Sequence, residues 1–286
     1  MPRTVDAPAT RSPVEAWIRV IRPGNLAMIA LAMFLFLRRW GIDFWSFPAW
    51  AATGVMVALA AGGNMINDYF DIREDAINKP RLALVGRVLK RRVVLISHWG
   101  WMALAWTLAG TLSWQMRAAG PLLWAVGLGL GLTFYSPLAK RKFLLGNLLV
   151  ATAVAQLPLW AGYVTLGSPF AAGGEGLALA GWAFALTFLR EVVKDLQDLE
   201  GDRNQGYRTL PVRWGAERTW KWIQTGIALA VAGLFVTASL RGGWASLGYI
   251  LPALGALRHA LQKDVRSLSA WLKVVMGAGL LVWGLG

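Results

Sequence analysis

Long apolar segments recur along almost the whole chain, and they restrict its possible folds more than any other feature. Hydrophobic residues occupy 56% of the 286 positions, and several windows are long enough to cross a bilayer as a helix. Helices satisfy every backbone hydrogen bond internally, which lipid requires. We therefore predict an all-α polytopic membrane protein that forms a single integral-membrane domain over residues 1–286. Its nine predicted spans lie near residues 16–37, 45–68, 93–114, 118–135, 144–166, 176–198, 219–240, 244–261 and 268–285.

Basic residues gather in alternate connections between the predicted spans. The formal net charge is +14, and 25 of the 29 Lys and Arg lie before Gly24 or within residues 73–92, 140–142, 190–221 and 258–273. This is the positive-inside pattern, which places the N-terminus and the basic loops in the cytoplasm. We therefore predict a multi-pass protein of the cytoplasmic (inner) membrane that contacts membrane lipids and no nucleic acid. The oligomeric state is left open.

Two acidic motifs with the same spacing follow even-numbered predicted spans. The first DxxDxxxD comprises Asp68, Asp71 and Asp75, and the second comprises Asp195, Asp198 and Asp202. On a continuous helix, such positions fall within an arc of about 60°. Asn64 and Asn67 extend the first set backwards, and Glu191 and Lys194 extend the second at the same offsets. Solvated helix ends would leave the matched spacing to chance, and acidic residues there oppose the helix dipole. The pattern favours one functional site built from residues 67–75 and 195–202.

The ligand types in these motifs suit magnesium. Six carboxylates around one site repel each other unless cations lie between them. The chain has no Cys and only two His, so the available ligands are hard oxygens. Mg²⁺ takes one or two carboxylates and completes its shell with phosphate oxygens. We therefore expect two or three Mg²⁺ ions that bridge a diphosphate and make it a good leaving group.

At these residues the chain resembles the UbiA superfamily of intramembrane prenyltransferases. The family signatures N-D-x-x-D-x-x-x-D and D-x-x-D-x-x-x-D correspond to residues 67–75 and 195–202. "YSPLAKRK", which contains Tyr135, is similar to the family's aromatic and basic loop, and "RPGN" at residues 22–25 to its first helix start. The resemblance covers most of the chain. It implies a nine-helix bundle with a central cavity and a cap of cytoplasmic loops.

The resemblance also implies a role for each matching residue. The expected metal ligands are Asn67, Asp68, Asp71, Asp75, Asp195, Asp198 and Asp202. The expected catalytic residues are Asp71, Asp198, Lys140 and Tyr135, with Tyr135 near the allylic carbon. Lys140 and Arg141 would contact diphosphate oxygens, although a positive-inside anchor explains them equally well. The other residues expected to bind substrate are Arg22, Asn25, Asn64, Asn147, Arg190, Lys194 and Arg208.

The acceptor is less tightly defined. "REVVKDLQDLEGDRNQGYRTLPV" and the Gly-Asn pair at residues 146–147 resemble the branch that includes geranylgeranylglyceryl-phosphate geranylgeranyltransferases. "RLALVGRV" at residues 81–88 departs from the Arg-Pro-x-Pro-Ser-Gly stretch of many members. We expect transfer of a prenyl group, geranylgeranyl by preference, from its diphosphate to geranylgeranylglyceryl phosphate or a similar polar lipid. The alternatives are aromatic quinone precursors (4-hydroxybenzoate, homogentisate or a naphthoate) and chlorophyllide-type acceptors.

Other classes of membrane protein fit the residues less well. The Asp-Gly-x-x-Ala-Arg run of CDP-alcohol phosphotransferases is absent. A carrier would place paired acidic helices near the bilayer midplane rather than at one face. A scaffold needs no matched acidic spacing. We expect His98 to be a structural or interfacial residue rather than a ligand or base, and Glu175 to be solvated. The glycines at 62–63 and within 127–132 are expected to serve close helix packing first.

Overall fold

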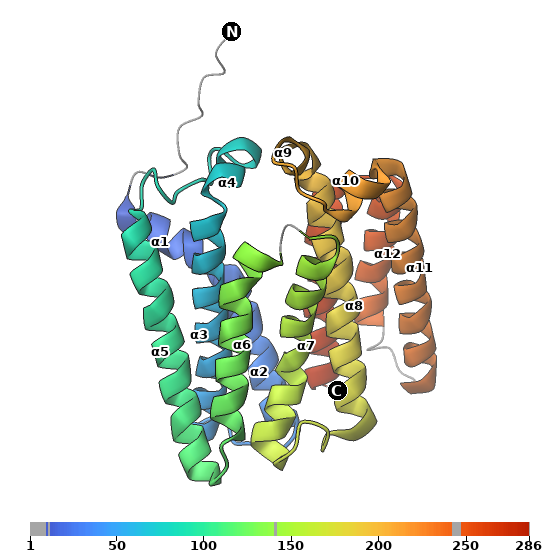
Figure 1. Cartoon of the computed structure of the whole chain (residues 1–286). Coiled ribbons are helices and arrows are strands. Elements are labelled where there is room, and N and C mark those ends of the chain that lie inside the picture. Colours follow the sequence, from blue (N-terminus) through green and yellow to red (C-terminus); the bar gives the residue numbers. More distant parts are fainter. Residues whose placement is uncertain (1–9, 11, 140–141, 242–246, 286) are drawn as a thin grey trace. The chain divides into compact units, whose positions relative to one another are not determined.

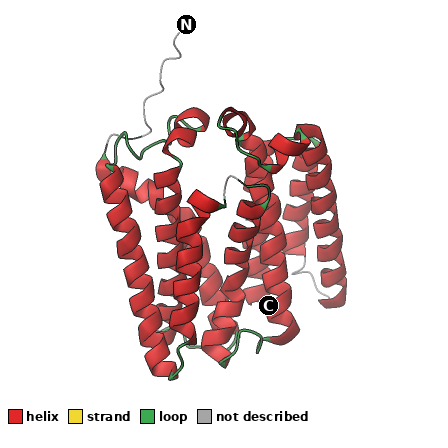
Figure 2. Ribbon diagram, viewed as in Figure 1, coloured by secondary structure: helices red, strands yellow, loops and turns green. Residues whose placement is uncertain are grey.

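The computed structural model describes residue 10 and residues 12–139, 142–241 and 247–285. Within these ranges the regular structure is helical, as Figure 2 shows, and the one β-bridge joins Val85 to Leu89. The all-α prediction is confirmed. The chain divides into two compact units, residues 1–37 with 41–141 and residues 38–40 with 142–286. Each unit carries one acidic motif, and each is described separately.

The helices are labelled in Figure 1. Those that begin in the first unit are α1 (Pro13–Ile21), α2 (Pro23–Arg39), α3 (Phe47–Phe70), α4 (Ile72–Asn78), α5 (Arg91–Met116) and α6 (Gly120–Leu138). Those of the second unit are α7 (Leu145–Leu166), α8 (Gly173–Gln197), α9 (Leu199–Asn204), α10 (Leu210–Trp214), α11 (Ala216–Arg241), α12 (Leu247–Leu261) and α13 (Val265–Leu285).

Seven helices among the described residues are long and apolar enough to cross a membrane, and an eighth span is possible if α1 and α2 count as one. The prediction of nine spans is therefore not confirmed. The first predicted span is broken at Arg22, where the chain bends by 42° between α1 and α2. Arg22 has a φ of 58°, which ends α1, and Pro23 starts α2 at a position where its missing N–H costs nothing. The eighth predicted span corresponds to α12, which has only 15 residues.

Small residues let the helices of the first unit approach closely. A Cβ atom added to Gly62 of α3 would lie 2.6 Å from Met102 Cε and 3.2 Å from Trp101 Cβ, both on α5. A Cβ atom at Gly129 of α6 would lie 3.1 Å from Trp106 Nε1. These contacts confirm the packing role expected for two of the glycines. Gly127 faces open space instead, with no atom of the described residues within 4 Å.

A buried histidine joins the same three helices. His98 Nδ1 lies 2.9 Å from the Gly62 carbonyl oxygen on α3, and Nε2 lies 3.3 Å from Thr133 Oγ1 on α6. The His98 side chain is fully buried. Both ring nitrogens therefore have partners within the helix bundle, as a buried polar group requires. The expectation that His98 is structural is confirmed.

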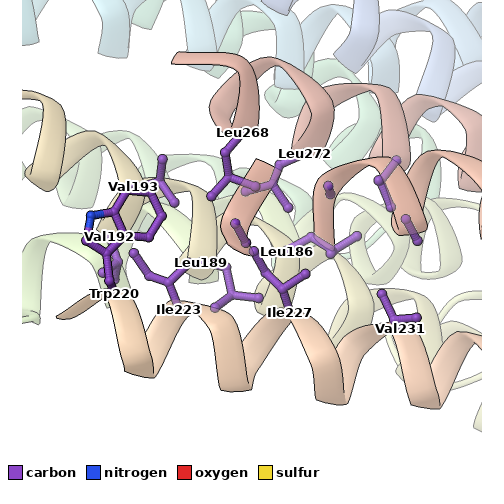
Figure 3. Packing of buried hydrophobic residues seen from close by; sticks show 14 of the residues in the cluster. Leu186, Leu189, Val192, Val193, Trp220, Ile223, Ile227, Val231, Leu268 and Leu272 are labelled. Atoms are coloured by element: carbon purple, nitrogen blue, oxygen red, sulfur yellow. The ribbon is translucent and has the colours of Figure 1, made fainter. Parts of the chain in front are cut away.

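The core of the second unit forms around α8. Its apolar residues recur at helical spacing and meet matching stripes on α11 and α13, as Figure 3 shows. The cluster includes Leu186, Leu189, Val192, Val193, Trp220, Ile223, Ile227, Val231, Leu268 and Leu272. Val192 and Val193 are fully buried, and only Lys194 separates them from the second acidic motif. The core therefore fixes the end of α8 from which that motif extends.

Glu175, which the sequence suggested was merely solvated, is part of a packed cluster. Its Oε1 accepts a hydrogen bond of 2.8 Å from Trp283 Nε1 and lies 3.9 Å from Arg39 Nη2. The Trp40 ring packs edge-on against Trp283, with ring centroids 6.1 Å apart. The solvated interpretation was wrong, since Glu175 has these partners. The sequence did not reveal them because they lie at the ends of distant segments.

Candidate metal and substrate site

The first acidic motif is interrupted by a break in the helix. The structure ends α3 at Phe70, and Asp71 adopts a φ of −88° and a ψ of 8°, whereas an α-helix has a ψ near −42°. Hydrogen bonds of helical spacing continue through the break, from Asp71 N–H to the Asn67 carbonyl and from Asp75 N–H to the Asp71 carbonyl. The prediction of one continuous helix face was wrong. Asp68 lies on α3, Asp71 at the junction and Asp75 on α4.

The second motif repeats this local structure. Asp198 lies between α8 and α9 with a φ of −98° and a ψ of 6°. Its N–H donates to the Lys194 carbonyl at 2.9 Å, and Asp202 N–H donates to the Asp198 carbonyl at 2.9 Å. Figure 1 shows α4 and α9 as short helices that follow α3 and α8. The two motifs therefore share backbone conformation as well as residue spacing.

The repeat extends to the helices that precede each motif helix. Arg22 directly precedes α2 and Leu144 directly precedes α7, and both have left-handed backbones, with φ values of 58° and 53°. Asn25 and Asn147 each follow three residues later. The α2–α3 and α7–α8 pairs therefore correspond: each begins after a left-handed residue and ends at the middle aspartate of a motif.

Arg22 binds the first motif. Its Nη2 donates to Asp68 Oδ1 at 2.6 Å, and its Nη1 donates to Asn64 Oδ1 at 3.4 Å. Asn64 Nδ2 in turn donates to the Ile21 carbonyl at 3.0 Å. Three predicted site residues, Arg22, Asn64 and Asp68, are thereby brought together, and the guanidinium offsets one carboxylate charge. Asn25 lies half-buried in the first turn of α2.

The other residues of the first half-site lie at the ends of α3, α4 and α6. Asn67 Oδ1 accepts a hydrogen bond of 2.9 Å from Ser136 Oγ on α6. Asp71 is buried, with 4% of its surface exposed, whereas Asp75 and Tyr135 are half-buried. Tyr135 directly precedes Ser136 in the chain, so it lies on the helix that contacts the motif. Lys140 and Arg141 lie outside the described residues.

In the second unit, neutral groups hold the corresponding carboxylates. Asn147 Nδ2 donates to Asp195 Oδ2 at 2.9 Å, and Thr209 Oγ1 donates to Asp202 Oδ2 at 3.1 Å. Asn147, which was expected to bind substrate, is 8% exposed and directly contacts the motif. Asp202 and Thr209 are both buried.

A charged cluster lies one turn before the second motif. Glu191 Oε1 accepts hydrogen bonds from Arg190 Nη1 at 3.1 Å and from Lys194 Nζ at 2.8 Å. The Arg190 and Glu191 side chains are only 14% and 12% exposed. Ionisable groups on a membrane-spanning helix are costly and often mark functional sites, so this cluster is a candidate substrate-binding site. Arg208 is exposed on the loop between α9 and α10.

Ser136 and Thr209 did not emerge as candidates from the sequence. Ser136 follows Tyr135 directly, and Thr209 follows Asp202 by seven residues and the turn glycine Gly206. Neither position forms part of a spacing pattern with the aspartates. The one signal that could have identified them is their nearness in the sequence to a recognised motif residue, and that signal is weak.

The donors present fit magnesium. Asn67, Asp71 and Asp75 in one unit and Asp195, Asp198 and Asp202 in the other offer only oxygen ligands. Among the described residues, no three His, Asp or Glu side chains form a ready metal cage. Mg²⁺ does not need such a cage, since it takes one or two carboxylates and leaves room for water and substrate phosphate.

Comparison with known sequences agrees with the family resemblance of the two acidic motifs. Residues 26–283 match the UbiA prenyltransferase family. The chain is 32% identical over 280 residues to digeranylgeranylglyceryl phosphate synthase from Natronomonas pharaonis, covering 96% of this chain and 97% of the relative. It is 34% identical over 283 residues to the enzyme of the same name from Methanopyrus kandleri, covering 94% and 98%.

Solved structures support the same fold. A structure described as giving insight into digeranylgeranylglyceryl phosphate synthase in membranes has a TM-score of 0.65 at 23% identity, covering 96% of this chain and 98% of that one. A UbiA homologue from Archaeoglobus fulgidus bound to GPP and Mg²⁺ has a TM-score of 0.60 at 17% identity, covering 93% and 99%. At these identities the likeness shows the fold.

Proposed function

The chain belongs to the UbiA prenyltransferase family, and on that premise we propose that it transfers a geranylgeranyl group from its diphosphate to geranylgeranylglyceryl phosphate or a closely similar polar lipid. The observation that carries the choice of acceptor is the 32–34% identity to digeranylgeranylglyceryl phosphate synthases over nearly the full length of both chains. The prenyltransferase activity itself follows from the family.

The two units form one catalytic domain in this proposal, with their acidic motifs on opposite sides of the diphosphate. Asn67, Asp71 and Asp75 hold Mg²⁺ on one side, and Asp195, Asp198 and Asp202 hold it on the other. Bound Mg²⁺, as two or three ions, offsets the negative charge that develops on the diphosphate as the carbon–oxygen bond breaks. Asp68 lies alongside the first group, with its charge already offset by Arg22.

The chain's own residues then orient the reactants. Lys140 and Arg141 contact diphosphate oxygens, and Tyr135 lies beside the allylic carbon, where an aromatic face contributes about 1–2 kcal/mol to cation stabilisation when desolvated. Apolar helices exclude water, which would otherwise compete with the acceptor. The acceptor hydroxyl forms the new carbon–oxygen bond and loses its proton, and diphosphate leaves with the electron pair of the broken bond.

The charged cluster on α8 fits the acceptor phosphate. Arg190 and Lys194 both pair with Glu191 and supply N–H donors that could also bind phosphate oxygens. Arg208 adds a further cation from the neighbouring loop. Asp198 and Glu191 are the two candidates to receive the hydroxyl proton. The active site and the N-terminus face the cytoplasm, in agreement with the positive-inside asymmetry.

The test is product formation by the purified full chain in detergent. Labelled geranylgeranyl diphosphate is supplied with Mg²⁺, and geranylgeranylglyceryl phosphate and 4-hydroxybenzoate compete as acceptors. We expect transfer to the glycerol lipid, loss of product with EDTA, and recovery when Mg²⁺ is restored. Asp71→Asn and Asp198→Asn should abolish transfer, and Asp43→Asn, outside both motifs, should not.

The outcomes separate the parts of the proposal. Transfer only to 4-hydroxybenzoate would keep the prenyltransferase chemistry and overturn the polar-lipid acceptor. Full activity of Asp71→Asn and Asp198→Asn would overturn the assigned metal ligands. Activity that persists after Mg²⁺ removal would overturn the metal dependence.

A further inference from the structure

Two hydroxyl groups contact the acidic motifs, one in each unit. Ser136 Oγ donates to Asn67 Oδ1 at 2.9 Å, and Thr209 Oγ1 donates to Asp202 Oδ2 at 3.1 Å. Neither hydroxyl belongs to the motif that it contacts: Ser136 lies on α6, and Thr209 directly precedes α10. Only 2% of Ser136 and 6% of Thr209 is exposed. Buried hydroxyls of this kind nearly always have a hydrogen-bond partner, and here the partner is a motif residue.

The loop between α9 and α10 returns Thr209 to Asp202. Gly206 has a φ of 72°, a conformation that residues with a Cβ rarely adopt. Directly after it, the Tyr207 N–H donates to the Asp202 carbonyl at 2.9 Å, and the Tyr207 side chain is buried. The Asp202–Thr209 contact is therefore built by eight consecutive residues of one unit.

Thr209 occupies a position where its hydroxyl would ordinarily cap a helix. It is the N-cap residue of α10, with a φ of −63° and a ψ of 164°, yet its side chain makes no capping hydrogen bond. An N-cap oxygen usually accepts from the second or third helical N–H. Here the second helical residue is Pro211, which has no N–H. The Thr209 hydroxyl donates to Asp202 instead. Asp is also a common N-cap residue, but an ionised Asp at position 209 could not make this bond because its carboxylate has no hydrogen to donate.

We propose that Thr209 and Ser136 are positioning residues for divalent-cation binding, each fixing the orientation of one metal ligand in its own motif. This inference rests on the proposed function, which assigns Asp202 and Asn67 to the metal. A hydrogen bond from the protein holds a ligand in one rotamer and reduces the order that it must gain when the cation binds. Loss of such an outer partner typically changes metal affinity by roughly 10–100-fold.

The experiment compares substitutions that differ in one hydroxyl. Thr209→Val removes the hydroxyl and keeps the side-chain shape, whereas Thr209→Ser keeps the hydroxyl. Thr219→Val is the matched control, since Thr219 is fully buried in the same unit and donates to the Gly215 carbonyl rather than to a motif. Ser136→Ala tests the first motif.

Cation binding is measured directly. Purified full-length protein in detergent is titrated with Mn²⁺ in the presence of geranylgeranyl thiodiphosphate, a slowly ionising analogue, and bound Mn²⁺ is followed by electron paramagnetic resonance. The Mg²⁺ concentration for half-maximal transfer provides a second measurement. We expect Thr209→Val and Ser136→Ala to weaken Mn²⁺ binding by about tenfold or more. Thr209→Ser and Thr219→Val should stay within about twofold of the wild type.

Each outcome supports or overturns the inference. Wild-type Mn²⁺ affinity in both Thr209→Val and Ser136→Ala would overturn it. Equal weakening by Thr219→Val, or no rescue by Thr209→Ser, would also overturn it, since either result points to a general packing effect. If Thr209→Val does not fold, Ser136→Ala decides. A wild-type chain that takes up no Mn²⁺ with the analogue would instead show that the proposed function has failed.

Discussion

The first aspartates of the two motifs have partners of different charge. Asp68 pairs with the guanidinium of Arg22, whereas Asp195 accepts a hydrogen bond from the neutral amide of Asn147. The Arg22 side chain is 38% exposed and that of Asp68 is 15% exposed, so water screens the pair only in part. The first aspartate of one motif is thus neutralised by a guanidinium, whereas the first aspartate of the other is held by a neutral amide.

Removal of Arg22 should therefore affect the enzyme through Asp68. We expect Arg22→Gln to lower transfer activity and thermal stability in detergent, because it leaves the Asp68 charge without its partner. Arg22→Lys should rescue poorly, since a point-charged ammonium cannot reproduce the forked contact with Asn64 and Asp68. A double-mutant cycle with Asp68→Asn should give a coupling energy of about 0.5–3 kcal/mol in thermal unfolding. If the effects of the two substitutions simply add, Arg22 does not act through Asp68, and a direct contact with the substrate becomes its role.

The sequence pattern marks these residues individually but does not encode their contacts. The regular spacing of the aspartates marked both motifs, because metal sites need several oxygen ligands within reach of one another. Arg22 and Asp68 are 46 residues apart, and Ser136 and Asn67 are 69 apart. Contacts over such distances depend on helix packing that no local spacing encodes. Arg22 and Asn147 were therefore assigned to substrate, although the structure bonds both to motif aspartates.

At the scale of the element, the three helix breaks differ in how clearly the sequence signals them. The break at Arg22 is followed by Pro23, a residue that favours the first position of a new helix. The breaks at Asp71 and Asp198 have no Pro or Gly beside them; Phe70 and Ile72 flank one, and Gln197 and Leu199 the other. Periodicity therefore predicted continuous helices. The hydrogen-bond spacing does continue, and only the backbone torsions of one residue change.

The α12–α13 pair offers a direct test of close packing. A Cβ atom at Gly255 would lie 2.8 Å from Trp271 Cζ3 and 2.9 Å from Cε3. The Trp271 ring also stacks on His259, with centroids 5.9 Å apart, so it has little room to shift. We expect Gly255→Ala to lower the free energy of unfolding by about 1–3 kcal/mol. Thermal unfolding in detergent measures the effect.

Gly277 on α13 provides the matched control. A Cβ atom there meets no atom of the described residues within 4 Å. Gly277→Ala should leave the melting temperature unchanged or raise it, since Ala is the better helix former by about 0.5–1 kcal/mol. Equal melting temperatures for the two variants would show that the Gly255 contact with Trp271 does not limit stability.

At the scale of the whole molecule, each compact unit contributes one motif to a site that the proposed function assigns to both. Each unit offers one set of three motif aspartates, and Mg²⁺ takes one or two carboxylates and completes its shell with water and phosphate oxygens. The family and the fold were predictable from the paired motifs and the apolar segments. The number of spans was not predictable. By length and composition seven helices qualify, or eight if the bent α1–α2 pair counts as one span, and the 15-residue α12 is too short to be counted.

Topology can be tested with the chain as it stands, because it contains no Cys. Ala76 on α4 and Ala119 between α5 and α6 are both exposed and lie at opposite ends of α5 in the chain order. The positive-inside asymmetry predicts that Ala76 lies in the cytoplasm and Ala119 outside. We therefore expect a membrane-impermeant maleimide to label Ala119→Cys in intact cells and to label Ala76→Cys only after the membrane is opened. The reverse pattern would place the first acidic motif on the outer face, where cytoplasmic prenyl diphosphate would not reach it.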